Sequence, residues 1–213
     1  MESGVTNPDG FHQNLIVMRH GHRLDNFDES WEKKAERPWD PPLTEKGCDT
    51  AFAVGSQLKK LSLPIHRIFV SPFLRCVQTA SNVVAALCSA DDNEPAEGID
   101  PSRVKVSIEF GLCEVLNNYA IRPKVAPTNG DLGFNLSELE ALLPAGTVDQ
   151  TLDRVYQEGT EVFRVGYCAY SHAARRIQFG KNKSFTAGSF QLLDIGPHEC
   201  SICFEAPQKS DGI

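Results

Sequence analysis

The segment Leu15–Arg23, with the sequence LIVMRHGHR, limits the choice of fold more than any other part of this chain. Its first four residues are apolar and predict a short strand buried on both faces. The strand ends in Arg-His-Gly-x-Arg, a set of side chains that packing inside a sheet does not require. Ligands bind at the carboxyl ends of strands in open α/β sheets, so the segment predicts a ligand site there. The alternative is a buried strand followed by a solvent-exposed polar turn.

The three charged or imidazole groups at the end of this strand favour phosphate as the ligand. Arg19 and Arg23 carry guanidinium groups, which bind phosphate oxygens through a planar fork. His20 follows Arg19 directly, and a neutral imidazole can act as a nucleophile near pH 7. We therefore expect an anion site that contains these three side chains.

Composition narrows the classes of partner. The 213 residues fit one large domain, or one domain with an insert. The net charge of −7 argues against nucleic acid or an anionic membrane as the main partner, so a local basic pocket must hold any anion. Residues 1–13 are polar and lack the apolar core of a signal peptide, and no apolar run approaches membrane-spanning length. We expect a cytoplasmic or nuclear location.

The cysteine content agrees with a cytoplasmic or nuclear location. The chain has seven, an odd number, which favours free thiols in a reducing environment over a disulfide framework. Cys200 and Cys203 form a lone C-x-x-C pair without a second pair or a histidine at ligand spacing. This pair is a weak indication of zinc or redox chemistry, and its role stays open.

Residues 25–42 form a polar segment that holds both tryptophans, Trp31 and Trp39. The segment is longer than a typical connection between a strand and a helix, and long connections often form lids or binding loops. The alternative is a surface loop whose tryptophans pack into the core.

Capping residues and apolar spacing predict alternating helices and strands after this insert. Thr44 is a good N-cap for a helix with apolar residues at helical spacing, namely Ala51, Val54, Leu58 and Leu61. A strand over 65–70 leads into Ser71 and Pro72, which predict a helix that starts at once, with an apolar face at Val77, Ala80, Val84 and Leu87. Capping boxes predict helices over 137–144 and 147–159, and further strands are expected at 104–108, 162–170, 185–195 and 199–205.

Two further residues are candidates for chemistry. Arg75 lies one turn into the helix after Ser71, where a cation opposes the helix dipole unless it reaches a negatively charged ligand. Glu114 is a single carboxylate among apolar residues, a setting that raises a carboxyl pKa and suits a general acid. The alternatives are a surface charge for Arg75 and a solvent-edge carboxylate for Glu114.

Taken together, these features resemble the histidine phosphatase superfamily, also called phosphoglycerate mutase-like. Three motifs occur in its order and rough spacing: Arg19-His20-Gly21-x-Arg23, Ser71-Pro72-x-x-Arg75-x-x-Gln78-Thr79-Ala80, and Glu114. The insert and the segment 39–47 look most like the branch that contains the phosphatase domains of suppressors of T-cell-receptor signalling and their plant and fungal relatives. The resemblance is good over about residues 14–158. The first motif differs from that of true mutases, which usually carry Arg-His-Gly-Glu-Ser.

The resemblance implies a fold and an activity. The fold would be three-layer α/β/α with a mainly parallel central sheet, in one domain over 14–213 that follows a polar tail at 1–13 and carries the insert at 25–42. The activity would be metal-independent hydrolysis of a phosphomonoester, either a phosphorylated small molecule or a phosphoprotein, with no cofactor. His20 would become a phosphohistidine, Glu114 would protonate the leaving alcohol, and three arginines would bind the phosphate, namely Arg19, Arg23 and Arg75.

One departure from the family concerns a second histidine, which normally binds the phosphate at the end of a late strand. His172 follows a strand-like run and could fill this role, although Ala173 replaces the usual glycine. The other interpretation is that the histidine is missing, together with a helix–strand unit before residue 162. Loss of that unit would remove a central strand, expose apolar surface and lower activity.

Three functions therefore remain open. The first is a phosphomonoester hydrolase, with full or impaired activity. The second is a phosphate-binding or interaction module without turnover, and the third, which the first motif disfavours, is a phosphoglycerate-type mutase. The sequence leaves the substrate and the oligomeric state undetermined.

Overall fold

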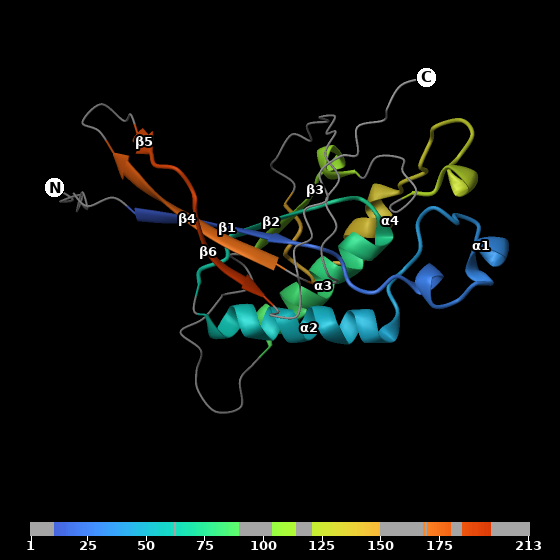
Figure 1. Cartoon of the computed structure of the whole chain (residues 1–213), viewed down its shortest axis with the longest axis horizontal. Helices are drawn as coiled ribbons and strands as arrows, with labels where there is room; N and C mark the ends of the chain where they lie inside the picture. The colour runs from blue at the N-terminus through green and yellow to red at the C-terminus, as the bar shows by residue number, and fades with distance from the viewer. Residues whose placement is uncertain are drawn as a thin grey trace, which may run out of the picture. The chain divides into compact units, whose positions relative to one another are not determined.

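The computed structural model describes residues 11–61, 63–89, 104–113, 121–149, 168, 170–179 and 185–196 (Figure 1). These residues belong to two compact units. The terminal unit combines residues 1–19 with 163–213, and the central unit contains residues 20–162. The predicted division into a polar tail over 1–13 and one domain over 14–213 stays a prediction. No helix among the described residues is long and apolar enough to cross a membrane.

The terminal unit contains an antiparallel sheet. Its strands are β1 (Phe11–Met18), β4 (Tyr170–Phe179), β5 (Phe185–Ala187) and β6 (Gln191–Gly196). β4 pairs with each of the other three strands, and all three pairings are antiparallel. The chain is α/β as predicted, but the expected mainly parallel sheet is wrong for the described strands, because β1 joins the late strand β4 in the opposite direction.

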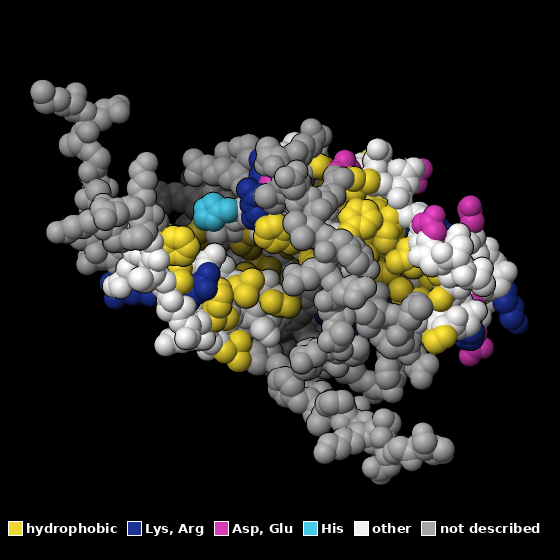
Figure 2. Space-filling view, turned by 90° about the horizontal axis from the view of Figure 1, so that it is seen from above, with side chains coloured by type: hydrophobic (Ala, Val, Ile, Leu, Met, Phe, Trp, Pro, Cys, Tyr) yellow, Lys and Arg dark blue, Asp and Glu magenta, His cyan; other side chains and the backbone are white. Residues whose placement is uncertain are grey.

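The apolar run that was expected to be buried on both faces lies in β1 and is partly exposed. Val17 is 63% exposed and Leu15 is 45% exposed. Among the described residues β1 pairs only with β4, and an antiparallel sheet can leave one face to water. Other large apolar side chains of this sheet are exposed as well, namely Phe11, Phe185, Leu192 and Leu193. Figure 2 shows that apolar side chains reach the surface of the molecule.

The central unit contains the parallel pairing. β2 (Arg67–Val70) and β3 (Lys105–Ile108) run parallel, with Val70 opposite Ile108. The helices are α1 (Trp31–Lys34), α2 (Glu45–Lys60), α3 (Leu74–Cys88) and α4 (Leu136–Glu140), with short 3-10 turns η1 (Leu24–Asn26), η3 (Phe110–Leu112) and η4 (Pro123–Val125). The core is formed by Val70, Val77, Ala80, Val84, Val104, Val106, Ile108, Leu139 and Leu143.

Helix α2 forms as predicted. Thr44 caps it by accepting a hydrogen bond of 3.0 Å from the amide of Gly47, and the predicted apolar residues Ala51, Val54 and Leu58 are buried. Leu61 instead lies at the C-cap and is 45% exposed. A Cβ atom added at Gly55 would lie 2.8 Å from the Cβ of Ala86, so α2 and α3 pack closely at this glycine.

Helix α3 buries the predicted apolar face but starts later than predicted. The residues on that face, Val77, Ala80, Val84 and Leu87, are all buried. Ser71 is not the cap, and its Oγ has no hydrogen-bond partner among the described residues. The helix begins at Leu74, whose amide donates a hydrogen bond of 2.8 Å to Asp40 Oδ1. A carboxylate from the insert thus replaces the local cap.

Several later boundaries also differ from prediction. Asn135, not Ser137, caps α4. The predicted helix start at Thr147 is wrong, because residues 147–149 are extended beside β3, with Val106 N bonded to Thr147 O at 2.7 Å and Asp149 N bonded to Val106 O at 2.8 Å.

The later strands are shifted as well. β4 begins where the strand predicted over 162–170 was expected to end, and the strand predicted over 185–195 is divided into β5 and β6. The remainder of the helix predicted over 147–159 and the strand predicted over 199–205 lie outside the described residues, as do Cys200 and Cys203.

Candidate active site

Three of the predicted site residues are buried in the central unit. His20 is 7% exposed, Arg23 is 5% exposed and Arg75 is fully buried. These values exclude a solvent-exposed turn for the first two and a surface charge for Arg75. Arg19 is half-buried and belongs to the terminal unit, so its place in the site stays a prediction. Glu114 lies outside the described residues.

Buried hydrogen bonds connect the segment that carries His20 to the first turns of α3. The amide of Gly21 donates to Thr79 Oγ1 at 3.0 Å, and this hydroxyl in turn donates to the carbonyl of Arg75 at 2.8 Å. Thr79 therefore joins two predicted motifs that lie 58 residues apart in the sequence. Both of its hydrogen-bonding roles are satisfied, which favours a single arrangement of the two segments.

Steric contact with the backbone of α2 explains why the motif Arg-His-Gly has a glycine at position 21. A Cβ atom added at Gly21 would lie 2.7 Å from the carbonyl oxygen of Gly47, and one added at Gly47 would lie 2.7 Å from the carbonyl oxygen of His22. The chain after His20 therefore crosses the first turn of α2 at backbone contact. The amide of Thr44 holds this crossing by donating to His22 O at 2.9 Å.

The ring of His20 is oriented by its neighbour. Its Nδ1 lies 2.8 Å from the carbonyl oxygen of Gly21. A carbonyl oxygen only accepts hydrogen bonds, so Nδ1 carries the proton in this contact. In the neutral imidazole the lone pair is then on Nε2, which is the nitrogen that can attack an electrophile.

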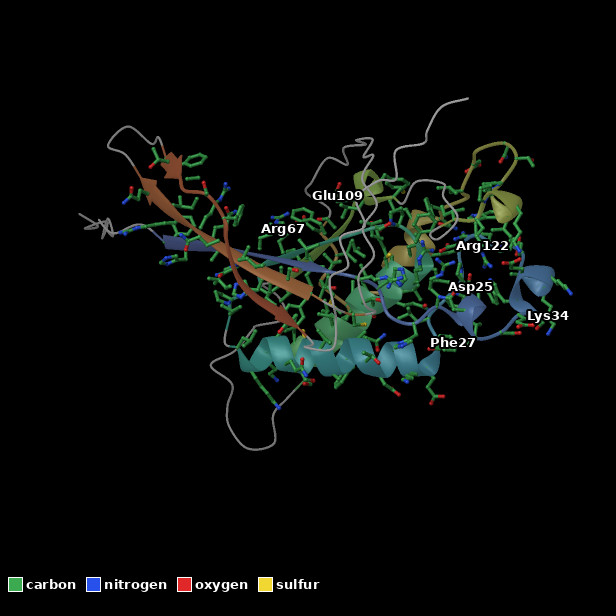
Figure 3. All side chains as sticks on the ribbon, in the orientation of Figure 1. Asp25, Phe27, Lys34, Arg67, Glu109 and Arg122 are labelled. Carbon is green, nitrogen blue, oxygen red and sulfur yellow. The ribbon has the colours of Figure 1, made fainter. Side chains whose placement is uncertain are left out.

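Arg23 is held by a buried carboxylate. Its Nε donates to Asp25 Oδ1 at 3.0 Å and its Nη2 donates to Asp25 Oδ2 at 2.7 Å, a two-point contact. Arg122 Nη2 also donates to Asp25 Oδ2, at 2.7 Å. Figure 3 shows Asp25 and Arg122 beside each other, near η1.

No motif in the sequence indicates a role for Asp25 or Arg122. The Arg-x-Asp spacing of the first pair is a weak local signal. Arg122 lies 97 residues away from Asp25, and nothing near it in the sequence indicates the contact.

Arg75 also lies near a carboxylate of the insert. Asp40 is 3% exposed, and its Oδ1 lies 3.8 Å from Arg75 Nη1. The guanidinium of Arg75 stacks 4.2 Å from the ring centroid of Phe73. Arg37 pairs with the other oxygen of Asp40. The insert thus supplies carboxylates that contact both buried arginines, Arg23 and Arg75.

The tryptophans of the insert are neither fully buried nor exposed. Trp31 and Trp39 are both half-buried, and Trp39 Nε1 donates to the carbonyl of Leu132 at 3.1 Å. The alternative of a surface loop anchored by its tryptophans stays open. Whether the insert acts as a lid or binding loop stays a prediction.

His172 lies inside β4, opposite Ile16 of β1, and is 7% exposed. Its Nε2 lies 2.9 Å from Asn14 Oδ1. The sequence predicts that His172 follows the end of a strand, whereas in the structure His172 is the third residue of β4. Its role as the second phosphate-binding histidine stays a prediction. Among the described residues, no group of three His, Cys, Asp or Glu side chains could hold a metal ion.

Comparisons with known proteins test the family. Residues 15–93 match the Histidine phosphatase superfamily (branch 1). The chain is 25% identical over 228 residues to the human ubiquitin-associated and SH3 domain-containing protein A, covering 88% of this chain and 32% of that protein. It is 36% identical over 78 residues to the ecdysteroid-phosphate phosphatase of Bombyx mori, covering 37% of this chain and 10% of that protein. The chain therefore spans about a third of the human relative, or less for the insect one.

A solved structure, the ecdysone phosphate phosphatase of Bombyx mori in complex with tungstate, is 18% identical with a TM-score of 0.46 and covers 94% of this chain and 97% of that chain. The matched residues contain the first two motifs, which confirms the family expected from them. Residues 15–93 of this chain therefore belong to the histidine phosphatase superfamily, branch 1.

Proposed function

We propose that this chain hydrolyses phosphomonoesters through a phosphohistidine formed on His20. The observation that carries the proposal is the orientation of this ring, whose Nδ1 contacts the carbonyl of Gly21 at 2.8 Å in a buried position. This contact keeps the proton on Nδ1 and the lone pair on Nε2, as a nucleophile requires. The family match supports the same chemistry, since two similar proteins are named as phosphatases, the ecdysteroid-phosphate phosphatase of Bombyx mori and the phosphohistidine phosphatase SixA of Escherichia coli.

The reaction has two displacements at phosphorus. In the first, Nε2 of His20 forms a bond to phosphorus, the ester P–O bond breaks, and the leaving oxygen takes a proton from Glu114. In the second, water attacks the phosphohistidine, the P–N bond breaks, and the Glu114 carboxylate takes the proton of the water. Inorganic phosphate and the alcohol are the products, and no metal takes part in either step.

The arginines would stabilise the charge on the phosphoryl oxygens in both steps. Arg23 and Arg75 are buried, and a guanidinium in a low-dielectric setting interacts with an oxyanion more strongly than one in water. Arg19 precedes the nucleophile directly and would contribute a third guanidinium. The substrate is a phosphorylated small molecule or a phosphoprotein. The name of the Bombyx mori relative gives an ecdysteroid phosphate as one such small molecule.

A phosphate-binding module without turnover is the second candidate. The two-point contact of Asp25 with Arg23 supports it, because a guanidinium held by a carboxylate gives less charge stabilisation to the displacement at phosphorus. The two candidates share a binding site and differ only in chemistry at His20.

Hydrolysis of p-nitrophenyl phosphate by matched histidine variants tests the proposal. His20→Ala should lower turnover by at least about a thousandfold, since it removes the nucleophile. His66→Ala is the control, because His66 is an exposed histidine of the same unit. Acid-labile phosphate on the wild-type chain, absent from His20→Ala, would identify the intermediate. A folded wild-type chain that binds phosphate but shows neither turnover nor label would support the binding module instead.

The same assay applied to His172→Ala tests the second histidine. A loss of roughly a hundredfold or more would give His172 a role in the phosphate site, by analogy with the removal of one oxyanion donor. Unchanged turnover would leave it a structural residue of β4, where it contacts Asn14.

A further inference from the structure

A buried carboxylate, Asp25, is shared by two arginines of the central unit. The side chain of Asp25 is 1% exposed, and it accepts three hydrogen bonds, two from Arg23 and one from Arg122. Both Nη2 atoms contact the same oxygen, Oδ2, at 2.7 Å. The guanidinium of Arg122 is thereby fixed close to that of Arg23, although the two residues lie far apart in the sequence.

This arrangement poses an electrostatic problem for the proposed phosphate site. A carboxylate that pairs with Arg23 alone would form a neutral pair, and a neutral pair attracts a phosphate dianion far less than a guanidinium does. The second guanidinium changes the balance, because two positive groups around one carboxylate leave one positive charge. Asp25 can then orient Arg23 without cancelling the attraction for an anion.

We propose that Arg122 is a positioning residue of the phosphate site, which acts through Asp25 to keep a net positive charge around Arg23. The inference rests on the proposed function and adds to it a residue outside the recognised motifs. Arg122 need not touch the phosphate, since its charge acts through the shared carboxylate over a short distance in a buried setting.

The contacts around Arg122 preserve this balance. Arg122 Nη2 also pairs with Glu32 of α1 at 2.5 Å, and Lys124 Nζ pairs with the same glutamate at 2.9 Å. The five side chains alternate in sign, from buried Arg23 to Lys124, which is 65% exposed, and both ends are positive. Figure 2 shows acidic and basic side chains together at the surface of the end where α1 lies. The network keeps one net positive charge, and its buried end is Arg23.

Binding of orthovanadate to the full chain, followed by tryptophan fluorescence, tests the inference. Arg122→Gln should weaken binding about tenfold, because Asp25 then neutralises Arg23. Arg122→Lys keeps the charge and should bind within about threefold of wild type. The decisive variant is Asp25→Asn combined with Arg122→Gln, which removes one charge of each sign. It should bind more tightly than Arg122→Gln alone and approach wild type.

A matched control separates charge balance from stability. Asp149 is a buried carboxylate of the same unit that pairs with Arg67, and Figure 3 shows Arg67 well apart from Asp25 and Arg122. Asp149→Asn breaks a similar ion pair and should leave vanadate binding unchanged. Thermal unfolding of every variant checks that each is folded.

The outcomes distinguish this inference from the proposed function. If wild type binds vanadate and Arg122→Gln binds equally well, the inference is wrong and the proposed function stands. If the double variant binds more weakly than Arg122→Gln, the network has only a structural role, which also overturns the inference. If folded wild type does not bind vanadate at all, the proposed phosphate site is wrong and the inference with it.

Discussion

The amide of Gly21 and the hydroxyl of Thr79 form a buried hydrogen bond of 3.0 Å that joins the segment carrying His20 to helix α3. The same hydroxyl also donates a hydrogen bond of 2.8 Å to the carbonyl of Arg75. Thr79 therefore helps to place the candidate nucleophile relative to this helix.

Thr79→Val should destabilise the chain and lower its activity. Valine has nearly the shape of threonine but leaves the buried amide of Gly21 without this acceptor, at a cost of about 1–3 kcal/mol. Urea unfolding and p-nitrophenyl phosphate hydrolysis measure the two effects. Thr79→Ser keeps the hydroxyl and is the control. Equal stability and turnover of the valine and serine variants would show that the hydrogen bond does not position His20.

Gly47→Ala should disturb the segment that carries His20 through its contact with α2. The added Cβ would lie 2.7 Å from the backbone oxygen of His22, and a backbone atom cannot move aside cheaply. We expect a loss of about 1–3 kcal/mol in the free energy of unfolding, measured by urea, with reduced turnover.

Gly188→Ala is the control for Gly47→Ala, because a Cβ at Gly188 would lie 3.6 Å from its nearest neighbour, the carbonyl oxygen of Arg176, an ordinary contact. An alanine at 47 that is tolerated as well as the one at 188 would contradict the proposed close approach of the chain after His20 to α2.

The sequence predicted well those features that depend on neighbouring residues. Thr44 caps α2 because its hydroxyl reaches the amide of Gly47 three residues later, a contact that any chain with this local pattern can make. The apolar spacing of α3 likewise predicted its buried face, from Val77 to Leu87. The sequence left the burial of His20 and Arg75 open, and the structure excludes an exposed turn for the first and a surface charge for the second.

Features that depend on distant residues could not be predicted in this way. Asp40 caps α3 from 34 residues earlier, and Arg122 reaches Asp25 across 97 residues. The antiparallel direction in which β1 and β4 pair also depends on residues that are distant in the sequence. The apolar run of β1 indicates a strand, but it does not specify that β4 will pair with it antiparallel, because the two strands are separated by most of the chain.

Asp40→Ala should affect both helix α3 and the setting of Arg75. The change removes the acceptor for the amide of Leu74, a cap worth about 0.5–2 kcal/mol, and the carboxylate near Arg75. Asp40→Asn keeps an oxygen that can accept the amide and removes only the charge. We therefore expect Asp40→Ala to be the less stable variant in thermal unfolding. Equal unfolding temperatures for the two variants would exclude a capping role for Asp40.

Glu32 should make a pH-dependent contribution to stability. The hydrogen bond from Lys124, with the nearby charge of Arg122, holds the pKa of Glu32 below its ordinary value of 4.5. A lowered pKa in the folded state means that the ionised form is favoured by folding. Its contribution is thus complete above about pH 4.5 and disappears as the pH falls through the lower folded-state pKa.

Glu32→Gln removes this contribution, so the stability difference between wild type and this variant should be largest near neutral pH and shrink as the pH falls below 4.5. High salt should also reduce the difference, because Lys124 is exposed and the pair is screened. Urea unfolding over a series of pH values measures it, with Glu36→Gln as the control, since Glu36 is an exposed glutamate of the same insert. A difference that stays constant or grows as the pH falls would show that Glu32 is not held in its ionised form by Lys124 and Arg122, and that the network around Asp25 does not extend to α1.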